Sequence, residues 1–237
     1  MTPISDWLIY QLADSAFPGG AFAHSQGLEA AWQLGEIGGE ADLVQFLDAS
    51  MRQGARGGLP FALAAHEGIA HAHEGAQRLV AGRASLAEVD HRCDLFLTSE
   101  VANRASRATG RGFLATCHRS LNVEAVAVIA DRLRDQRLPG HWAPVFGAVA
   151  GALGVPREQT AGLFLFVALR GTISAAVRLG IIGPIRGQAI QFSLSGLGQS
   201  LATRAFGWGM DDAAQVAPAI ELHQGAHDRL YSKLFLS

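Results

Sequence analysis

The hydrophobic residues of this chain recur at intervals of three and four, which is the period of an amphipathic helix. After Asp42, for example, the apolar positions of one predicted helix face are Leu43, Phe46, Leu47 and Met51. No stretch alternates apolar and polar residues over the length of a strand. The pattern therefore predicts an all-α protein, a single-domain bundle of roughly ten helices over residues 1–237.

Capping and breaking residues divide this pattern into segments. Ser25 is the expected N-cap of an early helix, and Ser85 with Glu88 forms an S-x-x-E capping box. We expect the glycines within residues 54–58 to end a helix, and Gly110 to break a later one. Further helices are predicted over residues 59–81, 113–119, 123–133, 144–153, 157–179 and 184–204.

The segment 157–179 is apolar on nearly every side, so it is predicted to be the central helix of the core. Gly180 follows it as the expected C-terminal stop. Arg170 and Arg178 lie within the apolar sequence, which favours a buried helix over a membrane span. A buried guanidinium needs an acceptor. Each arginine is therefore expected either to pair with a carboxylate in the core or to emerge in a groove that meets a partner.

Composition narrows the possible functions. Hydrophobic residues make up 49% of the chain and charged residues 17%, which predicts a large core, a sizeable interface, or both. The net charge is −2 without a long basic run, so nucleic-acid binding has little electrostatic support. The two cysteines are far apart, and the first residues lack the basic segment of a signal peptide. We therefore expect a cytoplasmic protein.

An apolar loop interrupts the helices near the N-terminus. Pro18 and Gly20 break any helix there, whereas Phe17 and Phe22 beside them make the loop more apolar than solvated loops are. Such a loop is predicted either to pack inside the domain or to be covered by a partner. His24 closes the loop and could bind a loop carbonyl with one ring nitrogen and a partner with the other.

Potential metal ligands are grouped weakly. His66, His71 and His73 do not form an H-E-x-x-H motif, and the solvated face of an alanine-rich helix accounts for them better. A nickel carrier that uses these three histidines is one alternative. Cys117 and His118 are adjacent, but no third ligand lies near them in the sequence.

Catalytic signatures are absent from the sequence. It contains no G-x-S-x-G nucleophile motif and no nucleotide-binding P-loop. Asp14 and Glu29 flank the apolar loop, and we expect them to hold backbone N–H groups or to pair with arginines. The alternative is an all-helical small-molecule enzyme that uses Asp14, His24 and Glu29.

The single domain is predicted to have an N-terminal segment and loop, residues 1–24, and a C-terminal partner-binding tail, residues 226–237. Leu230, Leu234 and Phe235 would form an apolar stripe if the tail were helical, and Tyr231 adjoins it. The tail is predicted to anchor a partner, the alternative being that it docks back onto its own domain.

These motifs resemble one protein family. Asp14-Ser15, followed by Phe17-Pro18-x-Gly20-x-Phe22-x-His24-Ser25-x-Gly27-Leu28-Glu29, resembles the N-terminal signature of the urease accessory protein UreF. Arg178-Leu179-Gly180 resembles the family's second signature, and Arg229-Leu230-Tyr231-Ser232-x-Leu234-Phe235-x-Ser237 resembles its C-terminal tail. Gly19 and Lys233 depart from the family's pattern, and the lysine weakens any bidentate contact from its position.

The resemblance implies an all-helical, dimeric, non-enzymatic maturation factor. UreF-like proteins bind UreD (also called UreH) and recruit the GTPase UreG, and the assembly delivers nickel to the urease apoprotein. The resemblance thus implies that the chain binds no cofactor itself, because its partners handle nickel and GTP. The residues expected to bind partners are Asp14, Phe17, Pro18, Gly20, Phe22, His24, Ser25, Gly27, Glu29, Arg178, Gly180, Arg229, Tyr231, Leu234 and Phe235.

Overall fold

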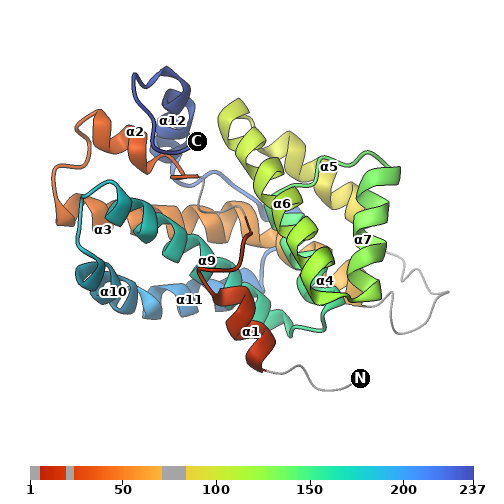
Figure 1. Cartoon of the computed structure of the whole chain (residues 1–237). Helices are drawn as coiled ribbons and strands as arrows, with labels where there is room; N and C mark the ends of the chain where they lie inside the picture. Colours follow the sequence, from red (N-terminus) through yellow and green to blue (C-terminus); the bar gives the residue numbers. More distant parts are fainter. Residues whose placement is uncertain (1–5, 20–23, 71–83) are drawn as a thin grey trace.

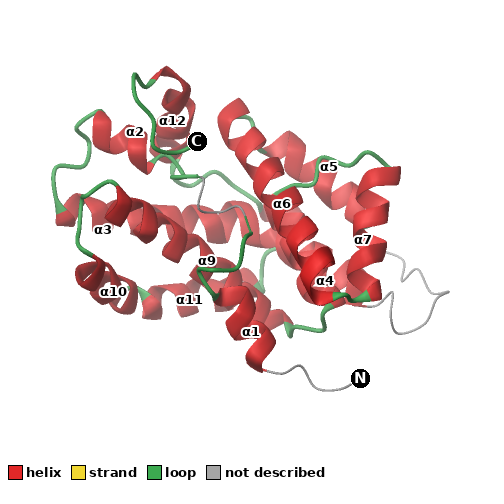
Figure 2. Cartoon of the chain, in the orientation of Figure 1, coloured by secondary structure: helices red, strands yellow, loops and turns green. Residues whose placement is uncertain are grey.

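The computed structural model describes residues 6–19, 24–70 and 84–237, and within them the chain forms helices and no strand (Figure 2). The α-helices are α1 (Asp6–Ala13), α2 (Leu28–Gln33), α3 (Glu40–Gln53), α4 (Leu59–Ala70), α5 (Leu86–Phe96), α6 (Glu100–Leu121), α7 (Glu124–Asp135), α8 (Trp142–Ala152), α9 (Arg157–Arg178), α10 (Pro184–Ser193), α11 (Ser195–Ala205) and α12 (Pro218–Ala226). Shorter turns are the π-helix η2 (Gly54–Gly58) and the 3-10 helices η3 (Met210–Asp212) and η4 (His227–Arg229). The predicted all-α class is confirmed.

The helices form two groups joined by α9 (Figure 1). In one group α8 packs against α4, α5, α6 and α7, and in the other α9 packs against α3, α10 and α11. Because α9 also contacts α4 and α8, it is the central helix that the sequence predicted. In the second group, α2 and α12 lie on one side of α3 and α9, and α10 and α11 lie on the other side (Figure 1).

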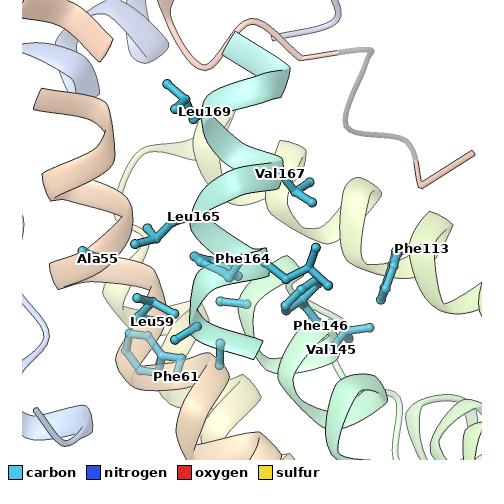
Figure 3. Packing of buried hydrophobic residues seen from close by; sticks show 14 of the residues in the cluster. Ala55, Leu59, Phe61, Phe113, Val145, Phe146, Phe164, Leu165, Val167 and Leu169 are labelled. Atoms are coloured by element: carbon cyan, nitrogen blue, oxygen red, sulfur yellow. The ribbon is translucent and has the colours of Figure 1, made fainter. Parts of the chain in front are cut away.

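The core is built around the apolar residues of α9. Figure 3 shows Phe164 and Leu165 of this helix between Leu59 and Phe61 of α4 and Phe146 of α8. The rings of Phe146 and Phe164 lie 5.5 Å apart in an edge-on arrangement, which is a favourable geometry for aromatic pairs. By length and composition α9 could cross a membrane, but 61% of its most apolar window is buried inside the protein.

The closest helix packing joins α4 to α8. A Cβ atom added at Gly147 would lie 1.8 Å from the carbonyl oxygen of Ala62, so the two backbones touch at this position. Only glycine permits such an approach. The crossing fixes α8, and with it the aromatic residues that face α9.

Two of the local capping signals predicted helix ends correctly. Ser85 Oγ accepts a hydrogen bond from the backbone N–H of Glu88 at 3.2 Å, as the capping box required. The central helix α9 ends at Arg178, and Gly180 two residues later has a φ of +72°. This left-handed conformation is the one that favours glycine after a helix.

Three predicted helix boundaries were wrong, and at two of them the close packing of glycines outweighed the local signals. Gly110 lies inside an unbroken α6, where a Cβ would come within 2.3 Å of the carbonyl oxygen of Gly140. Residues 54–58 continue the helical path as η2 instead of ending it, since their glycines pack against aromatic rings. The predicted helix 184–204 is divided into α10 and α11 at Leu194. The part of the predicted helix 59–81 beyond residue 70 lies outside the described residues.

Candidate partner-binding site

The first half of the apolar loop forms a turn that attaches to α6. Asp14 is exposed, and its side chain accepts a hydrogen bond from the backbone N–H of Ala16 at 2.9 Å. The carbonyl of Pro18 accepts from Thr116 Oγ1 at 2.8 Å, and the ring of Phe17 packs on an aromatic ring of α6. This half of the loop is therefore packed on its own domain. Gly20 and Phe22 lie outside the described residues.

The second half of the loop meets the C-terminal tail. His24 Nδ1 lies 2.6 Å from Ser237 Oγ, and the backbone N–H of Ser25 donates to the carbonyl of Ser237 at 2.6 Å. Ser25 Oγ donates to the same carbonyl at 3.1 Å. Ser25 is thus not the N-cap of α2; that position belongs to Gly27, which makes no side-chain cap. Instead, Ser25 holds the end of the tail.

Gly27 allows α2 to lie against α12. Its φ of +88° is left-handed, and an added Cβ would lie 3.1 Å from the backbone nitrogen of Gln224. Both the backbone conformation and the lack of space therefore require glycine. Since α12 leads directly into the tail, this contact sets where the tail begins.

Glu29 holds the middle of the tail. This residue is only 1% exposed, and its side chain accepts from the backbone N–H groups of Leu234 at 2.6 Å and Phe235 at 3.2 Å. His227 Nε2, on a fully buried ring, donates to the same carboxylate at 3.1 Å. Nearby, Gln33 Nε2 donates to the carbonyl of Ser232 at 3.0 Å. The expectation that Glu29 holds backbone N–H groups is confirmed.

Two arginines complete the attachment. The guanidinium of Arg178 lies 4.4 Å from the centre of the Phe235 ring, a cation–π contact that joins the second signature to the tail. Arg104 Nη2 donates to both carboxylate oxygens of Asp228 at 3.0 Å. That hydrogen bond is the main reason why the pKa of Asp228 is lowered.

Arg170 is half-buried and donates to the carbonyl of Ala13 at the end of α1, and burial lowers its pKa.

The tail is not helical, which corrects the predicted stripe. Beyond η4 the chain is irregular, and residues alternate: Phe235 and Ser237 are buried, whereas Leu234 and Leu236 are exposed. Tyr231 is fully exposed. Docking of the tail onto its own domain, the alternative left open by the sequence, is therefore what the structure shows, while half of its apolar side chains face outward. Arg229 is exposed as well.

The pKa of His24, which lies where the loop meets the end of the tail, is lowered. Burial, followed by the charges of His227 and Arg104, lowers its pKa below the ordinary value of 6.5. The neutral ring is therefore the stable form beside Ser237, and protonation would oppose the docked tail.

A second buried polar network holds the other group of helices and was not anticipated from the sequence. Asp90 accepts from the backbone N–H of His141 at 2.8 Å, and the His141 ring bonds Asp94 at 2.9 Å and Ser106 Oγ at 3.1 Å. Ser106 Oγ also accepts from the backbone N–H of Trp142 at 3.1 Å, so it caps α8. These contacts join α5, α6 and the start of α8.

Two of the remaining candidate ligands, His66 and Cys117, are buried, which corrects the solvated face predicted for His66. His66 is buried, with Nε2 2.7 Å from the carbonyl of Val155, and Cys117 is buried with its pKa raised to about 12. His71 and His73 lie outside the described residues. Within the described ranges no three His, Cys, Asp or Glu side chains gather as a metal site. Glu29 is fully engaged by the tail, which gives the alternative enzymatic use of this carboxylate no support.

Comparison with known proteins assigns the family. The family model for UreF matches residues 37–195. Urease accessory protein F of Arabidopsis thaliana is 31% identical over 235 residues, which cover 98% of this chain and 92% of the relative. The protein of the same name from Oryza sativa subsp. japonica is 28% identical over 237 residues, covering 99% and 86%. Urease accessory protein UreF of Trichodesmium erythraeum (strain IMS101) is 27% identical over 236 residues, covering 96% and 94%. The resemblance carried by the apolar loop and the tail is confirmed over nearly the whole length, and the chain belongs to the UreF family of urease accessory proteins.

Proposed function

We propose that this urease accessory protein is a non-catalytic scaffold for insertion of the nickel metallocentre of urease. In this proposal it binds UreD/UreH, recruits the GTPase UreG and acts on the urease apoprotein in the cytoplasm. The partners handle nickel and GTP, and the chain itself binds neither. Its two free, buried cysteines fit a reducing compartment.

The observation that supports this proposal is the two-sided tail. Its inward residues and backbone are held by Glu29, Ser25 and Arg178, while Tyr231 is fully exposed and Leu234 is 51% exposed. A rigidly held segment that presents aromatic and aliphatic side chains has already lost the entropy that a free peptide would lose on binding. Among the exposed apolar residues, Trp32 lies on α2, Leu34 directly follows α2 and Leu222 lies on α12, and both helices are beside the tail (Figure 1).

The same proposal includes a homodimer, for which α10 and α11 offer a suitable face. Residues 184–203 contain a single charged residue, Arg186, and it pairs with Glu40. Ile185 is 87% exposed and Phe192 is 82% exposed. Beside Phe192 a groove of about 610 Å³ runs between α9, α10 and α11. A protruding ring and a groove on one sparsely charged face suit a two-fold symmetric contact with a second copy.

The proposal is tested by urease activation in a reconstituted urease gene cluster at limiting nickel, with and without this chain. We expect activity to vanish without the chain while apo-urease is still present. Unchanged activity would refute a role in metallocentre assembly.

The role of the tail is tested by a matched pair of tyrosine variants. Tyr231→Ala removes the exposed tail ring, and Tyr10→Ala removes an exposed ring on α1, where Tyr10 is 65% exposed. We expect Y231A to lose capture of cognate UreD/UreH and Y10A to retain it, with the helical circular dichroism of both variants unchanged. Equal capture by both variants would exclude Tyr231 as an anchor.

A further inference from the structure

A pocket of about 220 Å³ lies where the two helix groups meet, between α3, α6, α8, α9 and α12. Its volume exceeds the roughly 150 Å³ of an engineered apolar cavity known to bind benzene. It is distinct from the exposed tail face, although His24 and Ser237 line one side of it.

The walls of this pocket are aromatic and small. Phe96, Trp142 and Phe164 supply rings, and the π-helix η2 supplies a glycine wall. A Cβ at Gly57 would lie 3.3 Å from the Phe96 ring, and one at Gly58 would lie 2.9 Å from the Phe164 ring. Single π-helical turns inside helices are frequent at functional sites. Here the turn places glycines where side chains would collide with the aromatic residues of the pocket.

One hydroxyl in the pocket lacks a partner. Ser50 lines the pocket from α3, and its Oγ is buried without a hydrogen-bond partner among the described residues. Buried polar groups are nearly always hydrogen-bonded, so an unpaired hydroxyl on a residue of the pocket wall points to a polar ligand atom beside it. By contrast, Gln53 beside it is satisfied, because its Oε1 accepts the backbone N–H of Val216 at 2.7 Å.

The pocket favours an uncharged ligand. Burial lowers the pKa of His24, so this ring is neutral at neutral pH. The carboxylate of Glu221 already accepts from Gln215 at 3.1 Å and Thr98 at 3.3 Å. An ion would lose its hydration here without a free charged partner, which is costly.

We infer that this pocket binds a small neutral aromatic molecule that carries one hydroxyl group, with the ring between Phe96, Trp142 and Phe164 and the hydroxyl on Ser50 Oγ. Such a site is independent of the proposed scaffold role, and its test needs neither urease nor the partner proteins.

The test compares phenol with toluene, which has a methyl group in place of the hydroxyl, by calorimetry and ligand-observed NMR on the full chain at millimolar ligand. Both should bind saturably to the native chain. Ser50→Ala should weaken phenol binding roughly fivefold, the effect of one lost hydrogen bond, and leave toluene binding no weaker.

A pair of variants on α6 locates the ligand. Ala105 lines the pocket, whereas Ala108 is exposed on the same helix. Ala105→Leu should abolish binding of both probes, and Ala108→Leu should leave it unchanged, with circular dichroism showing that both fold. Absence of saturable binding to the native chain, native-like binding by A105L, or equal effects of S50A on both probes would overturn the inference.

Discussion

Replacing Glu29 by glutamine should release the tail without unfolding the domain. Glutamine has nearly the same shape but offers one acceptor oxygen in place of two. The carboxylate accepts from two backbone N–H groups and from His227, at 2.6, 3.2 and 3.1 Å. In E29Q the amide oxygen can replace only one of the two carboxylate oxygens, and the amide NH₂ then faces a donor that has no acceptor.

The magnitude follows from the burial of this side chain. Glu29 is 1% exposed, so water cannot replace the lost acceptor. Hydrogen bonds to charged groups are worth about 1.5–3 kcal/mol each, and an unsatisfied buried donor costs a similar amount. A loss of about 3 kcal/mol corresponds to a roughly hundredfold larger population of the undocked tail. Because the core around α9 does not depend on these bonds, the opening should be local.

Amide hydrogen exchange measures this opening at Leu234 and Phe235. We expect protection of both amides to fall by roughly a hundredfold in E29Q, while the amides of α9 keep their protection. Glu40→Gln is the matched control, since Glu40 is an exposed carboxylate paired with Arg186 on the surface. If the tail amides of E29Q stayed protected to within about threefold of the native chain, the Glu29 carboxylate would not be what holds the tail.

Three further predictions concern His24, the crossing of α4 and α8, and the proposed dimer face. The pKa of His24 is lowered in the docked state, so the undocked state binds a proton more readily. Docking of the tail should therefore weaken as the pH falls below 6.5 towards the lowered value. NMR of the tail amides should show this weakening in the native chain and a flat pH profile in His24→Asn. Gly147→Ala should lower the free energy of unfolding in urea by about 3 kcal/mol or more, because its Cβ would overlap the backbone of α4, whereas Gly162→Ala, with open space around it, should be neutral or stabilising. Phe192→Glu should convert the proposed dimer to monomer in light scattering, whereas Leu222→Glu, on the other side of the molecule, should leave the dimer intact.

The sequence predicted the features that depend on local chemistry. The cap at Ser85 and the stop at Gly180 each involve atoms a few residues apart, and the central helix is recognisable because its own residues are apolar all round. Gly110 shows the limit of such signals. Its helix-breaking tendency is worth about 1 kcal/mol, which the close contact with the loop before α8 outweighs.

The candidate site could be predicted only in part, because its contacts join distant segments. The sequence identified Glu29 as a holder of backbone N–H groups, but its partner His227 lies 198 positions away. No local periodicity connects the two. The helical stripe predicted for the tail failed for a related reason: Glu29 and Ser25 bind tail backbone atoms that an α-helix would use internally.

The residues of the family motifs therefore form two sets, one that holds the tail and one that faces outward. Ser25 and Glu29 face the tail and are engaged by contacts within the chain, and His24 Nδ1 lies 2.6 Å from Ser237 Oγ of the tail. Tyr231 and Leu234 belong to the same motifs but face outward. A substitution in the first set should weaken partner binding by releasing the tail, and one in the second by removing a contact. Loss of binding alone does not distinguish these causes, whereas exchange of the tail amides does, because it changes only when the tail is released.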